Sequence, residues 1–249
     1  MTAPIALQLY TVREDLKRSG SGAVLERVAA LGYLGVEPFG LDPRSAQRMR
    51  VACDSLGLAI PSLHAPLAAG EARAAVVETA LALGTPRVVA SSRPDDVADE
   101  AALGRFVDRV LESHAALSEH DVALGLHNHW WEFESRAGLV PFDVLRERLP
   151  AEVFFEVDVY WAETAGVDAA GLVADLNERA PLLHVKDGPA RPGMPMVAVG
   201  EGALDIERIV RAASAEWLIV ELDECATDMF TAVARSLDFL RSTGLGAGR

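Results

Sequence analysis

The chain has 249 residues, of which 50% are hydrophobic, and its formal net charge at pH 7 is −14. This length suits one large α/β barrel, and the acidic excess disfavours a nucleic-acid partner, because neutralising phosphates requires a basic surface. No run reaches the ~18 apolar residues that would span a membrane, and residues 1–5 carry no pattern of a secretion signal. We therefore expect a cytoplasmic protein, with Cys53 and Cys225 as reduced thiols.

Apolar β-type runs alternate with amphipathic helical patterns along the whole chain. In chain order, the predicted elements are strand 5–9, helix 21–31, strand 34–37, helix 43–56, strand 58–64, helix 71–83, strand 87–90, helix 98–119, strand 122–127, helix 141–149, strand 153–157, helix 168–177, strand 182–185, helix 205–213, strand 217–221 and helix 227–240. Eight strand–helix pairs predict an α/β fold of the (β/α)8 TIM-barrel type, as a single domain over residues 1–249. A dinucleotide-binding sheet is poorly supported, since Leu9–Arg13 stands where its glycine-rich turn would be. The tail from Gly244 to Arg249 is predicted to fray.

Three of the later strands end in a residue that can bind a metal ion. Asp158 follows the mostly apolar run 154–157, His184 lies within the apolar run 181–185, and Glu221 ends the eighth strand. The carboxyl ends of barrel strands meet at one mouth, so these residues should lie close together. Carboxylates with an imidazole suit a divalent cation. Asp158 could instead cap a helix, but the next predicted helix begins near residue 168, which leaves Asp158 without a capping role and favours a role in the site.

The fifth strand is followed by the densest polar and aromatic cluster of the chain. His127 and His129, separated by one residue, can face the same side of a strand end. Trp130 and Trp131 offer a stacking surface for a sugar, although paired tryptophans more often pack in a core.

Lys186 shares a strand face with His184 and could stabilise an enolate or bind a hydroxyl group. Alternatively, it forms a salt bridge to Asp187 or Glu156 at the barrel rim. Residues that could hydrogen-bond a polyol, or serve only as caps and rim contacts, lie on the first half of the barrel: Gln8, Tyr10, Arg13, Glu37 and His64. Trp161 could form an aromatic wall.

Together these segments resemble the xylose isomerase-like TIM-barrel superfamily, in the branch of sugar phosphate isomerase/epimerase-like proteins. The resembling segments cover nearly the full length in the family's order: 7–13, 32–37, 127–133, 158–161, 184–188, 199–202 and 220–223. The resemblance implies a divalent metal ion (Mn, Mg or Zn) at the mouth, with Asp158, His184 and Glu221 as ligands. Where many relatives have a fifth-strand glutamate, this chain has His127, with Glu132 five residues later. Either could be the fourth ligand, and we favour Glu132, since three carboxylates and one imidazole suit a hard cation.

The resemblance further implies proton abstraction next to a carbonyl group of a small carbohydrate. Glu132, Glu221 and His129 are the candidates for proton transfer, with Lys186 stabilising the enediolate. The loop 199–202 is expected to close over the substrate, because Gly200 and Gly202 give it freedom. Glu201, in the same loop, is a candidate substrate contact or a plain surface charge.

The leading hypothesis is a metal-dependent isomerase or epimerase of a sugar or sugar phosphate. A lyase of the keto-inositol dehydratase or 3-keto-glycoside eliminase type begins with the same proton abstraction and stays open. A DNA-repair endonuclease of the same superfamily is disfavoured by the acidic charge and by missing ligands. A barrel that binds sugar without catalysis is a further alternative, and self-association into a homo-oligomer is expected from the resemblance.

Overall fold

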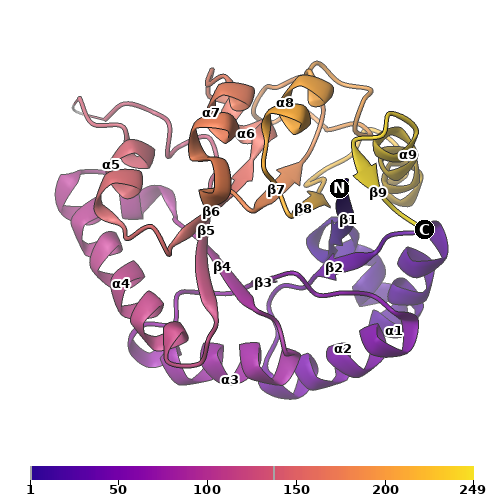
Figure 1. The fold of residues 1–249 in the computed structure, drawn as a ribbon, viewed down its shortest axis with the longest axis horizontal. Coiled ribbons are helices and arrows are strands. Elements are labelled where there is room, and N and C mark those ends of the chain that lie inside the picture. The colour runs from indigo at the N-terminus through magenta and orange to yellow at the C-terminus, as the bar shows by residue number, and fades with distance from the viewer. Residues whose placement is uncertain (1, 137) are drawn as a thin grey trace.

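A computed structural model describes residues 2–136 and 138–249; Met1 and Ala137 lie outside the described residues. Parallel strands form a barrel with the helices outside it, in the order β2-β1-β8-β7-β6-β5-β4-β3 (Figure 1). The barrel strands are β1 (Ala3–Gln8), β2 (Gly35–Glu37), β3 (Leu63–His64), β4 (Arg87–Ser91), β5 (Ala123–His127), β6 (Phe154–Asp158), β7 (Leu182–Val185) and β8 (Trp217–Val220). Backbone hydrogen bonds from Val36 N to Ala59 O and from His64 N to Pro38 O, both 2.9 Å long, join the two ends of this order. The predicted TIM barrel is confirmed.

The helices follow the predicted alternation, with differences at their ends. They are α1 (Arg13–Leu31), α2 (Pro43–Leu56), α3 (Arg73–Leu83), α4 (Glu100–Ser118), α5 (Pro141–Arg148), α6 (Val159–Thr164), α7 (Ala169–Leu176), α8 (Ile206–Ala212) and α9 (Met229–Ser242). Helix α1 begins eight residues earlier than predicted and contains a kink at Gly20, whose φ is +77°. The third strand is shorter than predicted, because Pro61 has no N–H group to donate to a neighbouring strand.

Asp158 has a capping role, contrary to the sequence-based expectation. Helix α6 begins immediately after β6, and one carboxylate oxygen of Asp158 accepts a hydrogen bond of 2.9 Å from Trp161 N. The segment Val159-Tyr160-Trp161 contains β-branched and aromatic residues, which have modest helix propensity, so the sequence did not indicate this short helix. Capping occupies Oδ1, and Oδ2 lies 2.9 Å from the ammonium of Lys186.

The C-terminal tail is ordered, so the prediction of fraying is wrong. Strand β9 (Gly246–Ala247) pairs with β1, and Arg249 N donates a hydrogen bond of 2.7 Å to Gly32 O. A side chain at position 246 would come within 2.6 Å of Ile5, which explains why glycine stands there. The tail thus covers the barrel at the N-terminal ends of the strands, because it pairs with the start of β1.

An apolar layer fills the barrel interior beneath the polar strand ends. It consists of Ala6, Val89, Phe154, Leu182 and Ile219. Phe154 occupies the space next to Gly125, where a Cβ atom would lie 2.2 Å from the ring. This layer supports the charged residues above it and keeps water away from their lower side.

No helix within the described ranges is both long and apolar enough to cross a membrane. Cys53 and Cys225 are free thiols, as expected, and burial raises the pKa of Cys53 to about 11.

Candidate active site

Two overlapping groups of metal-competent side chains lie at the C-terminal ends of the barrel strands. The first group is His127, Asp158, His184 and Glu221, all buried, with one candidate ligand atom of each within 4.8 Å of the others. The second group shares both imidazoles and adds His64 and Glu156. The structure therefore brings together the three ligands predicted with most support and the histidine of the fifth strand.

The donor atoms of the first group fit a divalent cation. His184 Nδ1 lies 2.8 Å from Glu221 Oε2, and His127 Nε2 lies 3.7 Å from Asp158 Oδ2. Asp158 Oδ2 is buried and makes no hydrogen bond, although the ammonium of Lys186 is 2.9 Å away. Burial lowers the pKa of His127 well below its usual value, and the nearby positive charge of His184 adds to this effect. A neutral imidazole and an ionised carboxylate are what a metal ion requires of its ligands.

Glu156 is a central residue that the sequence analysis did not assign to the site. Its Oε2 atom lies 2.6 Å from His64 Nε2, 3.2 Å from His127 Nδ1 and 3.1 Å from His184 Nε2. These contacts use the ring nitrogens of His127 and His184 that do not face the first group. Glu156 precedes Asp158 by two residues, and this spacing on a strand could have indicated that both side chains face the interior.

Glu37 supports the same histidines from the first half of the barrel. Its Oε2 atom lies 2.7 Å from His184 Nε2 and accepts a hydrogen bond of 2.6 Å from the amide of Gln8. Burial opposes the charge of Glu37, but the imidazoles of His64 and His184 lower its pKa to about 2. Burial and the charge of Glu37 raise the pKa of Glu156 to about 7. The pair therefore holds one ionised carboxylate and one that is protonated below about pH 7.

Lys186 is a buried cation held by three carboxylates. Its Nζ atom lies 2.9 Å from Asp158 Oδ2, 2.7 Å from Glu221 Oε2 and 2.8 Å from Asp223 Oδ2. These partners replace Asp187 and Glu156, which the sequence suggested. Burial opposes the charge of the ammonium, but the surrounding carboxylates raise its pKa well above the usual value. Lys186 therefore remains a hydrogen-bond donor across the physiological pH range.

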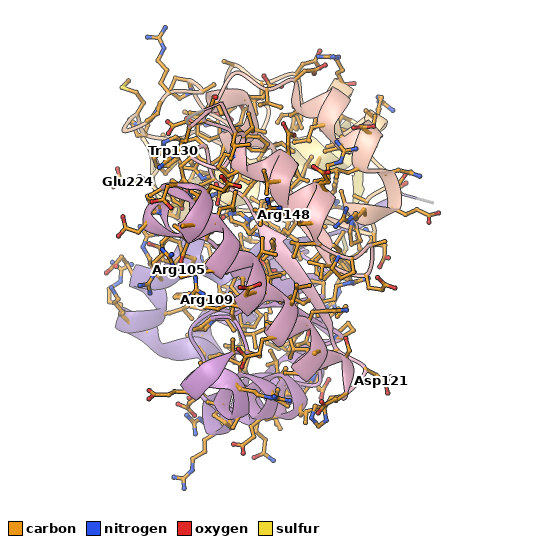
Figure 2. All side chains as sticks on the ribbon, turned by 90° about the vertical axis from the view of Figure 1, so that its left-hand side faces the viewer. Arg105, Arg109, Asp121, Trp130, Arg148 and Glu224 are labelled. Carbon is orange, nitrogen blue, oxygen red and sulfur yellow. The ribbon has the colours of Figure 1, made fainter. Side chains whose placement is uncertain are left out.

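A cavity of about 260 Å³ opens above these groups, and we call it the mouth cavity. It is lined by Gln8, Tyr10, Phe39, His64, Ser91, His127, His129, Lys186, Glu221 and Asp223. Three of the predicted substrate contacts, Gln8, Tyr10 and His64, are among these residues. Trp130 and Trp161 do not line it but contact each other, with ring centroids 4.7 Å apart. Trp130 lies at the end of the barrel that carries the mouth (Figure 2).

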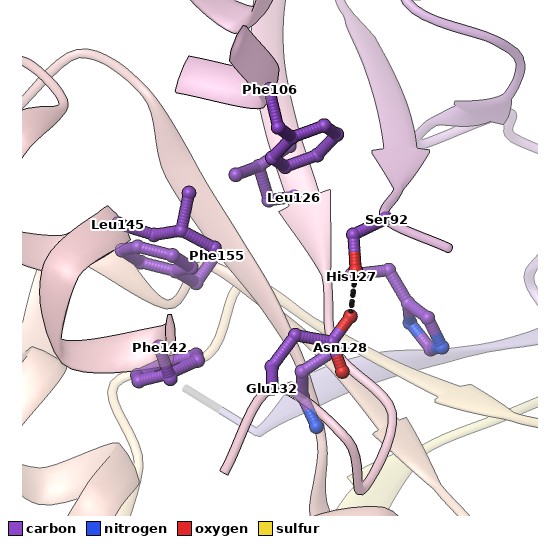
Figure 3. Close-up of a pocket in the computed structure, with 9 residues that line it drawn as sticks. All are labelled: Ser92, Phe106, Leu126, His127, Asn128, Glu132, Phe142, Leu145 and Phe155. Atoms are coloured by element: carbon purple, nitrogen blue, oxygen red, sulfur yellow. Dashed lines mark hydrogen bonds between the residues drawn. The ribbon is translucent and has the colours of Figure 1, made fainter. Parts of the chain in front are cut away.

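Glu132 lies apart from both metal-competent groups. Its Oε1 atom accepts a hydrogen bond of 2.6 Å from Ser92 Oγ, and its Oε2 atom accepts one of 2.8 Å from His129 N. Figure 3 shows the carboxylate turned to Ser92 at the edge of a small, mainly apolar cavity. Of the two residues considered for the fourth ligand, the geometry favours His127 over Glu132, because both oxygens of Glu132 are engaged elsewhere.

The loop after β7 is tied down by Asp187, which the sequence analysis treated only as a possible partner of Lys186. The buried carboxylate accepts hydrogen bonds from the backbone N–H groups of Gly188, Gly200, Gly202 and Leu204. A Cβ atom at position 200 would lie 2.3 Å from Phe239, and one at position 202 would lie 2.0 Å from Asp187. Glycine is required at positions 200 and 202 because these backbones pack closely against Phe239 and Asp187, and not because the loop needs freedom of movement. Glu201 is exposed and forms an ion pair of 2.6 Å with Arg235, outside the mouth cavity.

Comparisons with known proteins agree with this architecture. The family model described as "Xylose isomerase-like TIM barrel" matches residues 25–243. A sugar phosphate isomerase/epimerase from Parabacteroides distasonis ATCC 8503 superposes with a TM-score of 0.84 at 20% identity, covering 99% of this chain and 96% of that one. The probable 3-DHS dehydratase AsbF from Bacillus anthracis gives 0.76 at 13% identity, with 96% and 98% covered. A D-allulose 3-epimerase from Methylomonas sp. gives 0.71 at 14% identity, with 97% and 98% covered. No curated protein matches in sequence, and structural likenesses at this identity show a shared fold.

Proposed function

The chain belongs to the xylose isomerase-like TIM-barrel family, and on this premise we propose that it is a divalent-metal-dependent sugar isomerase or epimerase. The reaction would begin with removal of a proton from the carbon next to a carbonyl group. The observation that carries this proposal is the buried group of His127, Asp158, His184 and Glu221 directly beside the mouth cavity. Buried carboxylates and imidazoles that converge on one point are costly for stability, so their presence favours a role in binding a cation.

We assign the metal ligands to these four residues, with His127 in place of Glu132. Two imidazoles and two carboxylates favour Mn or Zn over Mg, which prefers an all-oxygen shell. A bound divalent ion supplies Lewis-acid polarisation of a carbonyl oxygen. Glu156 and Glu37 face the ring nitrogens on the other side of the imidazoles, where carboxylates commonly orient metal-binding histidines.

Lys186 serves as the donor that stabilises negative charge on the substrate oxygen. Its ammonium stays protonated, so it cannot act as a base. It can donate a hydrogen bond to an enediolate when one of its three carboxylate partners gives way, since an ammonium has three N–H donors. Its carboxylate partners hold it in place before the substrate arrives, which reduces the reorganisation needed during the reaction.

Proton transfer falls to Glu221 and His129, which both line the mouth cavity. Burial opposes the charge of Glu221, but Lys186 and His184 lower its pKa well below the usual value. It is therefore ionised at neutral pH, but the same positive charges weaken it as a base, which favours His129 as the stronger proton acceptor of the two. The ring of His129 stacks on Trp131 with centroids 4.0 Å apart, and its Nδ1 atom has no hydrogen-bond partner. Glu132 contributes indirectly, because it holds the backbone of His129.

The metal assignment is tested with a substitution that preserves the local structure. Asp158→Asn retains the helix cap, since asparagine caps as well as aspartate, but removes the charge at the site. Metal content of the purified protein should fall at least tenfold in Asp158→Asn and in Glu221→Gln. Asp223→Asn is the matched control, because Asp223 contacts Lys186 but belongs to neither metal-competent group. Normal metal content in both site variants would refute the ligand assignment.

The reaction is tested by incubating the metal-loaded protein with ketoses in heavy water. Proton NMR should show exchange at the carbon next to the carbonyl group, with formation of an isomer or epimer. Exchange accompanied by loss of a hydroxyl group or an aglycone would favour the lyase alternative. Binding of sugar without any exchange, in protein that retains its metal, would favour a binding function without catalysis.

A further inference from the structure

A second, larger depression shares one lining residue with the mouth cavity. This depression has a volume of about 450 Å³ and lies between α4 and the loops that follow β3 and β4; we call it the α4 groove. Ser91, the last residue of β4, lines both spaces. Ser91 therefore marks where a ligand held at the barrel mouth would come closest to the α4 groove.

The mouth cavity has no free cation to receive a phosphate group. Lys186 is the sole lysine or arginine among the described residues that line it, and three carboxylates already surround its ammonium. Arg13 lies nearby, but its two terminal nitrogens donate to the carbonyl oxygens of Tyr10 and Asp223. A phosphate would bring a charge of about −1.5 to −2 at pH 7. The charge of the proposed metal ion is offset by its carboxylate ligands Asp158 and Glu221, so the ion leaves no excess positive charge in the mouth cavity for such a group.

The α4 groove is mixed in polarity and close to neutral in charge. Arg93 and Arg109 are balanced by Asp96 and Glu112, and Arg109 forms an ion pair with Asp96. Arg109 projects from α4 near the mouth end of the barrel (Figure 2). Apolar contact surface comes from residues such as Leu67. Arginine donors and carboxylate acceptors can hydrogen-bond the hydroxyl groups of a second sugar, and the apolar residues can contact its C–H face. A phosphate group would instead need an excess of positive charge.

We propose that the substrate is an uncharged glycoside: the ring that reacts occupies the mouth cavity, and a second sugar or similar polar substituent occupies the α4 groove. This inference rests on the proposed function for the reacting ring. The size and charge of the substrate, however, can be tested by binding measurements that need no turnover. Of the sugars and sugar phosphates that the resemblance left open, an uncharged glycoside excludes the sugar phosphates.

The test is calorimetric titration of the metal-loaded protein with glucose, glucose 6-phosphate, cellobiose and trehalose. At least one disaccharide should bind about tenfold or more tightly than glucose, and glucose 6-phosphate should bind more weakly than glucose. Tighter binding of glucose 6-phosphate, or failure of both disaccharides to exceed glucose, would overturn the proposal. Failure of the proposed function would appear separately, as absent proton exchange with ketoses.

Filling the groove locates the effect. Ala69 lines the α4 groove but not the mouth cavity, so Ala69→Trp should abolish the advantage of the disaccharide and leave glucose binding unchanged. Ala74→Trp, at an exposed position of α3 outside the groove, is the matched control and should retain the advantage. An unchanged disaccharide advantage in Ala69→Trp would contradict placement of the second sugar in the α4 groove.

Discussion

Replacing Asp187 by asparagine should destabilise the protein strongly, although the two side chains have nearly the same shape. The carboxylate is fully buried, and each of its oxygens accepts two backbone N–H groups: Gly188 (2.8 Å) and Leu204 (3.2 Å) bind Oδ1, and Gly200 (2.9 Å) and Gly202 (3.0 Å) bind Oδ2. Asparagine offers one oxygen, so two of these hydrogen bonds are lost and its amide faces other donors. At about 1.5–3 kcal/mol for a hydrogen bond to a charged group, the expected cost is about 3–6 kcal/mol.

The assay is urea unfolding followed by circular dichroism, compared with Asp205→Asn. Asp205 lies in the same region but is exposed and accepts one hydrogen bond of 3.0 Å, from Arg208 N at the start of α8. Asparagine is an equally good cap, so the control should lose less than about 0.5 kcal/mol. A loss below about 1 kcal/mol in Asp187→Asn, or one equal to the control, would refute the idea that this carboxylate fixes the loop.

Three further predictions concern the interior of the barrel. In metal-free protein, the raised pKa of Glu156 means that the folded state keeps a proton that the unfolded chain releases near pH 4.5. The contribution of this proton to the free energy of unfolding is therefore complete below pH 4.5 and is lost as the pH rises to about 7. Glu156→Gln should remove this loss of up to about 3 kcal/mol, measured as the free energy of unfolding against pH, and an unchanged pH profile would contradict the assigned pKa. Lys186→Met should slow proton exchange by about 100-fold or more. In metal-free protein it should also destabilise the fold by about 3–5 kcal/mol, because the buried carboxylates of Asp158 and Glu221 and the partly exposed one of Asp223 lose their partner. Exchange at the wild-type rate would exclude Lys186 from the reaction. Gly125→Ala should cost about 1–3 kcal/mol in thermal or urea unfolding, because the new methyl group would meet the ring of Phe154, and wild-type stability would show that this layer can adjust.

The agreement between sequence and structure is best where local patterns suffice. Alternating apolar strands and amphipathic helices identified the barrel, because each element carries its own periodicity of hydrophobic residues. Disagreements arose at segments whose conformation depends on distant partners. The tail is ordered because β1 and Gly32 offer it hydrogen bonds, and the loop after β7 is fixed because its backbone surrounds Asp187.

The candidate site shows the same division. Asp158, His184 and Glu221 could be selected from the sequence, because each ends or closes a strand at the mouth of a parallel barrel. The choice between His127 and Glu132 could not be made in this way, since Glu132 lies in a loop, where sequence spacing does not indicate the direction of a side chain. In the structure, Glu132 accepts hydrogen bonds from Ser92 and from the backbone of His129.

By itself, the sequence determined the alternation of elements and the set of strand ends that carry carboxylates and imidazoles. Only the tertiary structure decided which atoms meet: Glu156 with three imidazoles, Lys186 with three carboxylates, and Ser91 between the mouth cavity and the α4 groove. The physical reason is that strand periodicity specifies the face on which a side chain lies. Its depth in the barrel and its partners on other strands depend on the register and tilt at which the sheet closes.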